Sequence, residues 1–348
     1  MELKFAILPK SDLESIVKLV QTIRDQYQDS KIIIFGGTGF IGSWLTHSLL
    51  YCNNQLNLNL DIKVVTRNEQ RARDKFPYLE RNAVTFLEHD FSKAELTSDA
   101  RADYVFHGAT PTRSQTGSSD DFNLVNGSVN AAIHATRIRS TKFKKPRVIH
   151  LSSGAVYGEQ PVDMKRRSED DSAEMGLSSY AIAKVSVERI LRTAAKEGKI
   201  NLQSPRLFAF AGPLLQLDAH YAVGNFLLDG LSNRPIKVKG NPNTVRSYMY
   251  PSDLVSALLR ISVEEKYQNF NIGSEEIVTM SDLAQQISFM TCNNTVEFTN
   301  PEVPTSNYVP STANLKMLMP NFEPIGIQES LSRWVDWIYA TDALTKEE

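Results

Sequence analysis

The sequence predicts an α/β fold with an open, doubly wound parallel sheet and a smaller C-terminal α/β lobe. Short, continuous apolar runs alternate with helical stretches from residue 31 to about residue 210. Such runs are typical of strands buried on both faces of a parallel sheet. A glycine-rich turn joins the first run directly to a helix, and strand–helix alternation on this scale favours a doubly wound sheet.

The composition is that of an ordinary globular protein and excludes several classes of function. Hydrophobic residues make up 41% of the 348 residues, enough for a large core and two lobes. The formal net charge is −2, so neither nucleic acid nor a membrane is an expected partner. The two cysteines, Cys52 and Cys292, lie far apart without metal-ligand spacing. We therefore expect no metal, no disulfide framework and a cytoplasmic location.

The chain divides into three expected regions. Residues 1–29 form a helical extension, residues 30–212 the main domain, and residues 213–348 mainly the smaller lobe, with a return of the chain to the main domain left open. In the extension, residues 11–28 carry apolar side chains at helical spacing, with Ser11 as N-cap and Glu14 completing a capping box. We expect this helix to pack on the main domain; partner binding is the alternative.

Five apolar runs are the candidate strands of the main domain. They are KIIIFGG (31–37), IKVVTR (62–67), VTFLEHD (84–90), YVFHGAT (104–110) and RVIHLSS (147–153). Beyond Gly212 the rhythm becomes irregular, and the short strands expected there are PIKVKG (235–240), TVRSYMY (244–250) and QNFNIGS (268–274). This change of rhythm predicts the smaller lobe.

The turn GGTGFIG places Gly36, Gly39 and Gly42 at regular spacing between a strand and a helix. Glycines permit the tight turn, and the helix start, with Phe40 and Ile41, offers backbone amides to a pyrophosphate. The context predicts a Rossmann-type site for a nicotinamide dinucleotide; the alternative is a glycine turn without a ligand.

Residues at the ends of the next two strands bear on the choice of cofactor. A free ribose 2′-hydroxyl is usually held by a carboxylate at the end of the second strand, but Thr66 and Arg67 stand there. A guanidinium suits a 2′-phosphate, so NADP is favoured over NAD. If Arg67 merely stacks on adenine or faces solvent, NAD remains open. Asp90 is a candidate acceptor for the adenine amine, and a surface turn residue is the alternative.

A set of three residues later in the chain forms the candidate catalytic group. Tyr180 and Lys184 lie four residues apart, which on a helix places them on one face. An ammonium beside a phenol favours the phenolate, so Tyr180 could exchange a proton with a sugar hydroxyl during hydride transfer. Ser153, about thirty residues upstream after a strand, completes the pattern.

These motifs together resemble the extended short-chain dehydrogenase/reductase family, which contains nucleotide-sugar epimerases and dehydratases. The resemblance runs from about Lys31 to Trp337 and includes, in order, GGTGFIG, HGAT, SSGAVYG, YAIAK, RLFAFAGP, VRSYMYPSDL and FNIGS. It implies that Ser153 bonds the reacting oxygen, Tyr180 is the acid/base and Lys184 orients the ribose. It also implies cofactor contacts at Ala109 and Thr110, the latter also facing substrate, and a homodimer built from two helices per subunit.

The resemblance further implies that the smaller lobe grips a nucleoside diphosphate sugar. Arg246 and Asn225 resemble residues that contact this substrate. The alternatives are a surface ion pair for Arg246 and a helix cap for Asn225. Leu124 and Ala209 stand where many relatives carry asparagine, which indicates a less usual branch or a differently seated substrate.

One departure from the family pattern narrows the chemistry. Dehydratases of this family carry an acid and a glutamate directly after the position of Ser153, where this chain has Gly154 and Ala155. Neither residue can transfer a proton, so the usual 4,6-dehydration and decarboxylation are disfavoured. Hydride transfer at one sugar carbon, most simply C4, remains, as in a 4-epimerase or a 4-keto reductase.

Two alternatives stay open at this point. Carboxylates on polar loops could restore dehydratase chemistry; the candidates are Asp120, Asp121, Glu159 and Glu169. A non-catalytic dinucleotide-binding protein is the other alternative, but such a protein would need only the glycine turn, not Ser153, Tyr180 and Lys184 as well.

Overall fold

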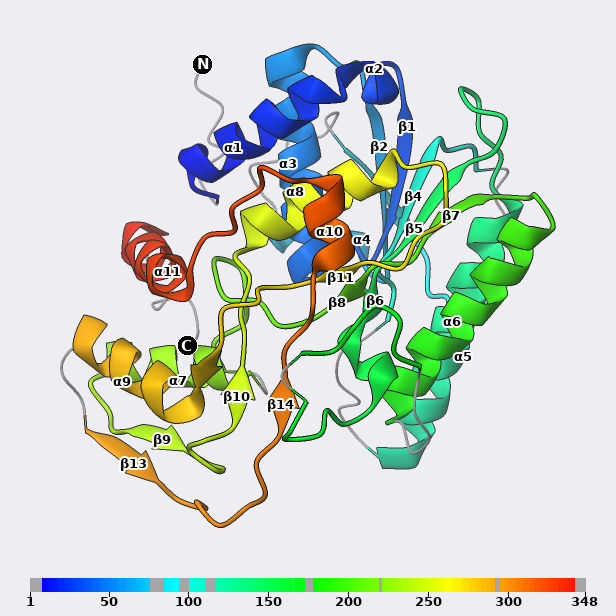
Figure 1. The fold of residues 1–348 in the computed structure, drawn as a ribbon. Coiled ribbons are helices and arrows are strands. Elements are labelled where there is room, and N and C mark those ends of the chain that lie inside the picture. Colours follow the sequence, from blue (N-terminus) through cyan, green and yellow to red (C-terminus); the bar gives the residue numbers. More distant parts are fainter. Residues whose placement is uncertain are drawn as a thin grey trace. The chain divides into compact units, whose positions relative to one another are not determined.

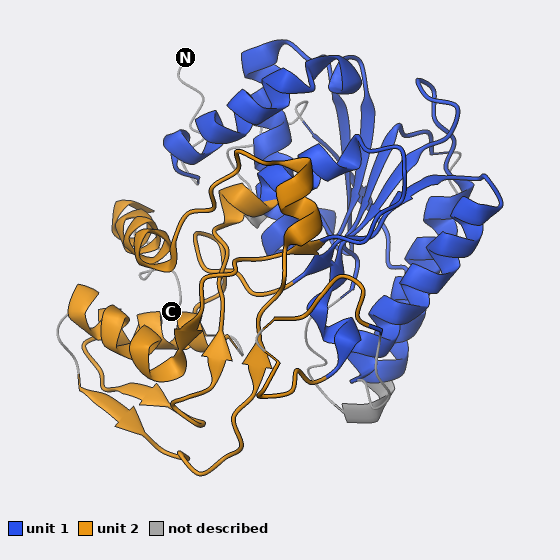
Figure 2. Cartoon of the chain, viewed as in Figure 1, with its two compact units in different colours: residues 1–158, 172–207, 255–270 blue, residues 159–171, 208–254, 271–348 orange. Residues whose placement is uncertain are grey.

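The computed structural model describes residues 8–75, 84–93, 100–110, 117–164, 166–172, 178–218, 221–291 and 295–341 (Figure 1). The chain forms two compact units, drawn in blue and orange in Figure 2. Unit 1 comprises residues 1–158, 172–207 and 255–270, and unit 2 comprises residues 159–171, 208–254 and 271–348. The chain therefore passes several times between the two units.

Unit 1 is built on a six-stranded sheet with the order β3-β2-β1-β4-β5-β7. Neighbouring strands run parallel, which confirms the predicted parallel sheet. The order reverses between β1 and β4, and sheets of this kind bind ligands at the carboxyl ends of strands beside such a reversal. The strands are β1 (Lys31–Phe35), β2 (Asp61–Thr66), β3 (Thr85–Glu88), β4 (Tyr104–His107), β5 (Arg147–His150) and β7 (Asn201–Gln203).

Helices cover both faces of this sheet (Figure 1). One face packs on α5 (Gly117–Arg137) and α6 (Ser179–Lys196), where Ile33 and Phe35 share a buried cluster with Val187. Successive strand residues alternate between faces, so the buried Ile32 and Ile34 face the opposite side. On that side lies α3 (Phe40–Leu56). The apolar runs are thus continuous because both faces of their strands are covered.

Apart from two N-terminal helices, unit 1 contains several further elements. They are α4 (Glu69–Lys75), the parallel pair β6 (Ser152–Ser153) and β8 (Arg206–Leu207), the 3₁₀ turn η1 (Gly154–Tyr157) and the later part of α8 (Pro251–Ser262). Because β6 and η1 directly follow β5, they carry Ser153 to the carboxyl end of the sheet.

The N-terminal helix forms, but its predicted cap is wrong. Helix α1 spans Lys10–Thr22, with Pro9 at the N-cap and no side-chain cap. The Pro9 carbonyl accepts hydrogen bonds from the amides of Asp12 and Leu13, so the first turn starts before Ser11. After Ile23 a four-residue helix follows, α2 (Arg24–Tyr27). The apolar face of α1 is buried and contacts α3, as expected for a packing helix.

Unit 2 contains small sheets and helices. Strand β10 (Val245–Arg246) pairs with β12 (Val278–Thr279) and β14 (Asn307–Tyr308), and β9 (Ile236–Val238) pairs with β13 (Val296–Phe298). The other elements are α7 (Ala222–Leu231), β11 (Asn271–Ile272), α9 (Met280–Met290), α10 (Ala313–Leu318) and α11 (Ile327–Thr341). Each of the three short runs expected here contains a strand. In the described parts of both units, no helix is both long and apolar enough to cross a membrane.

Candidate functional site

The glycine turn after β1 is tightly packed against the end of β4. Gly36 has a φ of 77°, and a Cβ there would lie 2.7 Å from the carbonyl oxygen of Gly108. A Cβ on Gly42 would collide with the Gly36 carbonyl oxygen and lie 2.5 Å from the Gly37 Cα. Both positions therefore require glycine, the first also because an L side chain rarely adopts that φ.

Helix α3 begins inside this turn. Gly39 is its N-cap, and the Gly39 amide donates to the Gly36 carbonyl at 3.1 Å. Phe40, Ile41 and Gly42 supply the first amides of the helix. A helix N-terminus carries partial positive charge and directs backbone N–H groups outward, which suits a pyrophosphate. The residues of this turn thus fit a dinucleotide.

The end of β4 contributes the neighbouring segment, Ala109 and Thr110. The Gly108 amide donates to the Phe35 carbonyl at 2.9 Å, and the Thr110 amide donates to the Gly108 carbonyl at 2.9 Å. Thr110 is buried, and its hydroxyl makes no hydrogen bond to the described residues. A ligand at the glycine turn would thus meet a hydroxyl that the described protein leaves unsatisfied.

The ends of β2 and β3 lie side by side, because Thr66 pairs with Glu88. The Thr66 side chain is buried and its hydroxyl donates to the Asn68 carbonyl at 3.2 Å, whereas Arg67 is exposed. Asp90 accepts bonds from the amide and hydroxyl of Ser92. Burial opposes ionisation of Asp90, but these bonds and the charges of Lys93 and Arg67 hold its pKa below the usual range. Asp90 is thus a turn residue with one oxygen engaged by Ser92.

Two of the candidate catalytic residues lie at the start of α6. Ser178 is the N-cap and its hydroxyl accepts a bond from the Ala181 amide, which places Tyr180 in the first turn. Tyr180 is half-buried, whereas Lys184 is only 3% exposed. The Lys184 Nζ lies 5.5 Å from the centre of the Tyr180 ring and donates to the Leu151 carbonyl at 2.6 Å. Lys184 therefore links Tyr180 to the strand end that leads to Ser153.

Ser153 itself caps the turn η1. Its Oγ accepts a bond from the Ala155 amide at 3.2 Å, and the residue is 6% exposed. Helix α6 contacts both β6 and η1. The structure thus brings Ser153, Tyr180 and Lys184 onto elements that touch one another within unit 1.

The surroundings of Lys184 are strongly desolvated. Burial lowers the pKa of Lys184 to about 7, although the carboxylate of Glu188 opposes this shift. Two buried histidines on neighbouring strands, His107 and His150, lie nearby. Burial, followed by the charge of Lys184, lowers the pKa of His107 to about 3 and that of His150 well below its ordinary value. The histidines are therefore neutral.

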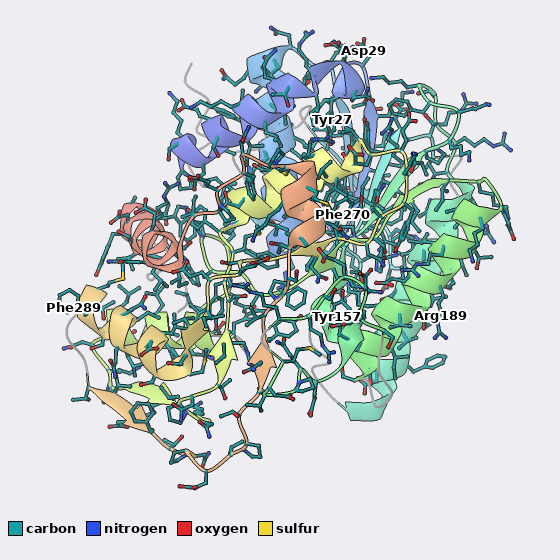
Figure 3. All side chains as sticks on the ribbon, viewed as in Figure 1. Tyr27, Asp29, Tyr157, Arg189, Phe270 and Phe289 are labelled. Atoms are coloured by element: carbon teal, nitrogen blue, oxygen red, sulfur yellow. The ribbon has the colours of Figure 1, made fainter. Side chains whose placement is uncertain are left out.

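A buried polar network that the sequence did not predict lies beside Ser153 and Lys184. Glu188 accepts a bond from the Ser152 hydroxyl at 2.6 Å and from Arg206 at 3.2 Å. The Arg206 guanidinium lies 4.6 Å from the ring centre of Tyr157, which Figure 3 labels. One signal was present: Glu188 follows Lys184 by four residues and so shares its helix face.

The predicted substrate residues of unit 2 are partly buried. Arg246 donates to the carbonyls of Val245 and Ser306 and to the Ser306 hydroxyl. Its guanidinium is thus bound by neutral oxygens, whereas the alternative from the sequence was a surface ion pair. Burial lowers the pKa of Arg246, while Tyr248 and Tyr308 oppose the shift. The helix-cap alternative for Asn225 is wrong, because α7 begins at Ala222 with Tyr221 as N-cap.

The loop carboxylates have separate environments. Asp121 accepts a bond from the Ser179 hydroxyl at 2.9 Å, at the first residue of α6. In unit 2, Glu159 is exposed and Glu169 is buried; burial raises the pKa of Glu169, and the Asn314 amide donates to it. The side chain of Asp120 lies outside the described residues. Leu124, at one of the departures from the family pattern, is buried, and Ala209 at the other is half-buried.

The strand order and the glycine turn define a dinucleotide-binding protein of the Rossmann class. More particularly, the chain belongs to the NAD-dependent epimerase/dehydratase family, whose model matches residues 32–273. This confirms the resemblance seen in the sequence, and the chain is an enzyme of that family.

Named relatives are distant. The chain is 31% identical over 270 residues to the dTDP-4-dehydro-6-deoxyglucose reductase of Escherichia coli, covering 74% of this chain and 81% of that protein. It is 24% identical over 260 residues to UDP-glucuronic acid decarboxylase 5 of Arabidopsis thaliana, covering 74% and 73%. A similar solved fold is the UDP-glucuronic acid 4-epimerase of Bacillus cereus in complex with NAD, with a TM-score of 0.72, 21% identity and coverage of 89% and 98%.

Proposed function

We propose that the protein is a NAD(P)-dependent reductase of 4-keto nucleotide sugars. The observation that carries this proposal is the composition of the site: Ser153, Tyr180 and Lys184 are on contacting elements, and Gly154 and Ala155 follow Ser153. These three residues can transfer one proton to or from one sugar oxygen. Gly154 and Ala155 cannot remove a proton from a neighbouring sugar carbon, as dehydration requires. The relative at 31% identity is named as a reductase of a 4-keto sugar nucleotide, which supports the same assignment.

The reduction needs one hydride and one proton. When bound, the nicotinamide dinucleotide supplies the hydride that adds to the carbonyl carbon. Tyr180 donates its phenolic proton to the carbonyl oxygen as negative charge develops there. Lys184 stabilises the phenolate that remains, and Ser153 donates a hydrogen bond to the same oxygen. The product is the alcohol, and Tyr180 regains its proton from solvent.

A 4-epimerase is the second candidate, because the same three residues suffice for oxidation followed by reduction on the other face. The fold neighbour named as a 4-epimerase favours it. Dehydration through a loop carboxylate is less supported. Asp121 accepts a hydrogen bond from Ser179 at the start of α6, and it does not occupy the positions directly after Ser153.

The test is incubation with UDP-, GDP-, CDP- and dTDP-sugars and with their 4-keto derivatives, followed by mass spectrometry. A reductase converts a 4-keto sugar to a product heavier by two hydrogens and consumes the reduced dinucleotide. An epimerase leaves the mass of a 4-hydroxy sugar unchanged, and a dehydratase removes water. Turnover of 4-hydroxy sugars alone would contradict the reductase assignment.

Tyr180→Phe tests the proton donor. Removing the hydroxyl should lower kcat by about 10²–10⁴, the usual contribution of a general acid. The affinity for the dinucleotide should change little, because the ring and Lys184 remain. Steady-state kinetics and fluorescence titration with NADPH measure the two effects. Activity equal to that of the wild type would remove Tyr180 from the mechanism.

Arg67→Asp tests the preference for NADP. The exposed guanidinium directly after β2 would pair with a 2′-phosphate in this proposal, and a carboxylate there suits a free 2′-hydroxyl instead. We expect the ratio of kcat/KM for NADPH to that for NADH to fall about tenfold or more, as expected for a lost charged hydrogen bond. Arg101→Asp, at an exposed arginine before β4, is the matched control. An unchanged ratio in Arg67→Asp would remove the argument for a 2′-phosphate.

We propose the remaining ligand contacts from the same resemblance. Asp90 would face the adenine with the oxygen that Ser92 does not engage, and Arg246 and Asn225 would hold the sugar diphosphate. The half-buried guanidinium of Arg246, held by neutral oxygens of Ser306, keeps its full charge for an anionic ligand.

We also propose a cytoplasmic homodimer formed by α5 and α6. Apolar side chains near the starts of these helices are exposed: Phe122 is 72% and Ile182 47% exposed. Isolated exposed apolar residues are common on protein surfaces. The proposal therefore rests mainly on the family resemblance, which implies a dimer built from two helices per subunit. Sedimentation analysis of the purified chain tests the dimer. A mass equal to that of one chain would contradict it.

A further inference from the structure

Glu188 ties the strand end that carries Ser153 to the helix that carries Tyr180 and Lys184. Glu188 is 5% exposed, and one carboxylate oxygen accepts a hydrogen bond of 2.6 Å from the hydroxyl of Ser152, the residue before Ser153. The segment is thus bonded to α6 twice, because Lys184 holds the carbonyl of Leu151. Two short bonds directly before a reacting residue restrict its position.

Arg206 extends this link past Ser153. It donates from Nε to one oxygen of Glu188 and from a terminal nitrogen to the other, both at 3.2 Å. Its guanidinium also lies over the ring of Tyr157, the last residue of the turn that Ser153 caps. Glu188 therefore holds residues on both sides of Ser153, Ser152 directly and Tyr157 through Arg206.

Glu188 is also the anion that faces the buried cations of this region. Arg206 is 8% exposed, and Lys184 lies one helical turn before Glu188. Arg192, further along α6, lies 3.6 Å from the Glu188 carboxylate. Among the described residues, Tyr180 on α6 and His107 and His150 on the sheet are further titratable groups that interact with Lys184, and both histidines are neutral. A carboxylate among desolvated cations stabilises their charged forms.

We propose that Glu188 is a positioning residue of the reaction: with Ser152 and Arg206 it holds Ser153 against α6, and its carboxylate favours the charged form of Lys184. This inference rests on the roles proposed above for Ser153, Tyr180 and Lys184. It predicts two separable effects, one on the geometry of the strand end and one on the charge of the lysine.

Two variants separate these effects. Glu188→Gln keeps an oxygen that accepts from Ser152 but removes the negative charge. Ser152→Ala keeps the charge but removes the bond to the strand end. Asp103→Asn is the matched control, because Asp103 is a fully buried carboxylate of unit 1 that accepts bonds from Ser140 and the amides of Lys31, Thr141 and Lys142 at the start of β4, the opposite end of the strand from the site.

The readouts are NADPH binding by fluorescence titration across pH and kcat/KM across pH. In Glu188→Gln, the high-pH loss of binding and of kcat/KM should move to lower pH by about one unit, the lower end of the usual effect of a neighbouring opposite charge. Ser152→Ala should lower kcat about tenfold, with KM and the pH dependence unchanged. Asp103→Asn should keep the wild-type pH dependence even where its stability falls.

Coincident pH profiles of Glu188→Gln and the wild type, or an equal displacement in Asp103→Asn, would overturn the charge argument. Wild-type kcat in Ser152→Ala would overturn the positioning argument. If Glu188→Gln does not fold, Glu188→Asp replaces it: its pH profile should coincide with that of the wild type because the charge remains, and a displaced profile would overturn the charge argument. A wild-type protein that binds NADPH but reduces no 4-keto sugar would refute the proposed reaction, while the binding profiles would still test Glu188.

Discussion

Lys184→Met gives a stability test of the buried ammonium that does not depend on activity. The lysine is almost completely buried, and burial lowers its pKa to about 7 from an ordinary value of 10.5. Methionine has a similar length and no charge. Removing the charge should therefore stabilise the fold where the lysine is protonated in the folded state.

The sign and size follow from the two pKa values. Below about pH 7 the lysine is protonated in both states, so its buried charge costs stability in full; between about 7 and 10.5 only the unfolded chain keeps the proton, and the cost declines as pH rises. Each pH unit in this window corresponds to about 1.4 kcal/mol. From about pH 6 to about pH 9, the wild type should thus gain about 2–3 kcal/mol relative to Lys184→Met. Loss of the bond to Leu151 costs about 1 kcal/mol in the variant with little dependence on pH.

The assay is urea unfolding followed by circular dichroism, without a dinucleotide, at several pH values for the wild type and Lys184→Met. The difference in unfolding free energy should favour the variant most at low pH and shrink as pH rises. Lys18→Met, at an exposed lysine of α1, is the control and should run parallel to the wild type. Parallel curves for Lys184→Met and the wild type would refute the argument that the ammonium is desolvated.

Two further predictions concern packing. Gly42→Ala should destabilise the protein by about 1–3 kcal/mol and weaken NADPH binding, because its Cβ would collide with the Gly36 carbonyl; Gly240→Ala, where nothing lies within 4 Å, is the control. Unfolding and binding equal to the wild type in Gly42→Ala would show that the turn can open. Tyr27→Phe should cost about 1 kcal/mol in urea unfolding, because the Tyr27 hydroxyl loses its 2.7 Å bond to Ser262, and an unchanged midpoint would contradict this.

The parallel sheet could be predicted because its strands are buried on both faces. A strand such as Lys31–Phe35 then has no polar alternation, and its apolar run is visible without any knowledge of its partners. The cap of α1 could not be predicted in the same way. Ser11 and Glu14 satisfy the capping-box spacing, but the carbonyl of Pro9 already accepts the first amides. The helix therefore starts at an equally local contact that the capping-box rule does not consider.

The candidate site shows the same division. The glycine turn and the Tyr180–Lys184 spacing are local patterns, so the sequence contains them. The partners of Glu188 are not local: Ser152 is 36 residues away and Arg206 is 18 residues away. Only the fold brings these three side chains together, and nothing in the spacing of a lone glutamate indicates which donors will reach it.

The two adjacent serines after β5 have opposite hydrogen-bond roles. Successive side chains of a strand point to opposite faces, so Ser152 and Ser153 on β6 cannot serve the same partner. Ser152 donates a hydrogen bond to Glu188 and thereby links the strand to α6. Ser153 instead accepts from the Ala155 amide, which leaves its own proton for an acceptor beyond the turn. In the mechanism proposed above, a carbonyl oxygen that becomes an alkoxide would be such an acceptor, and Gly154 and Ala155 belong to the turn that Ser153 caps.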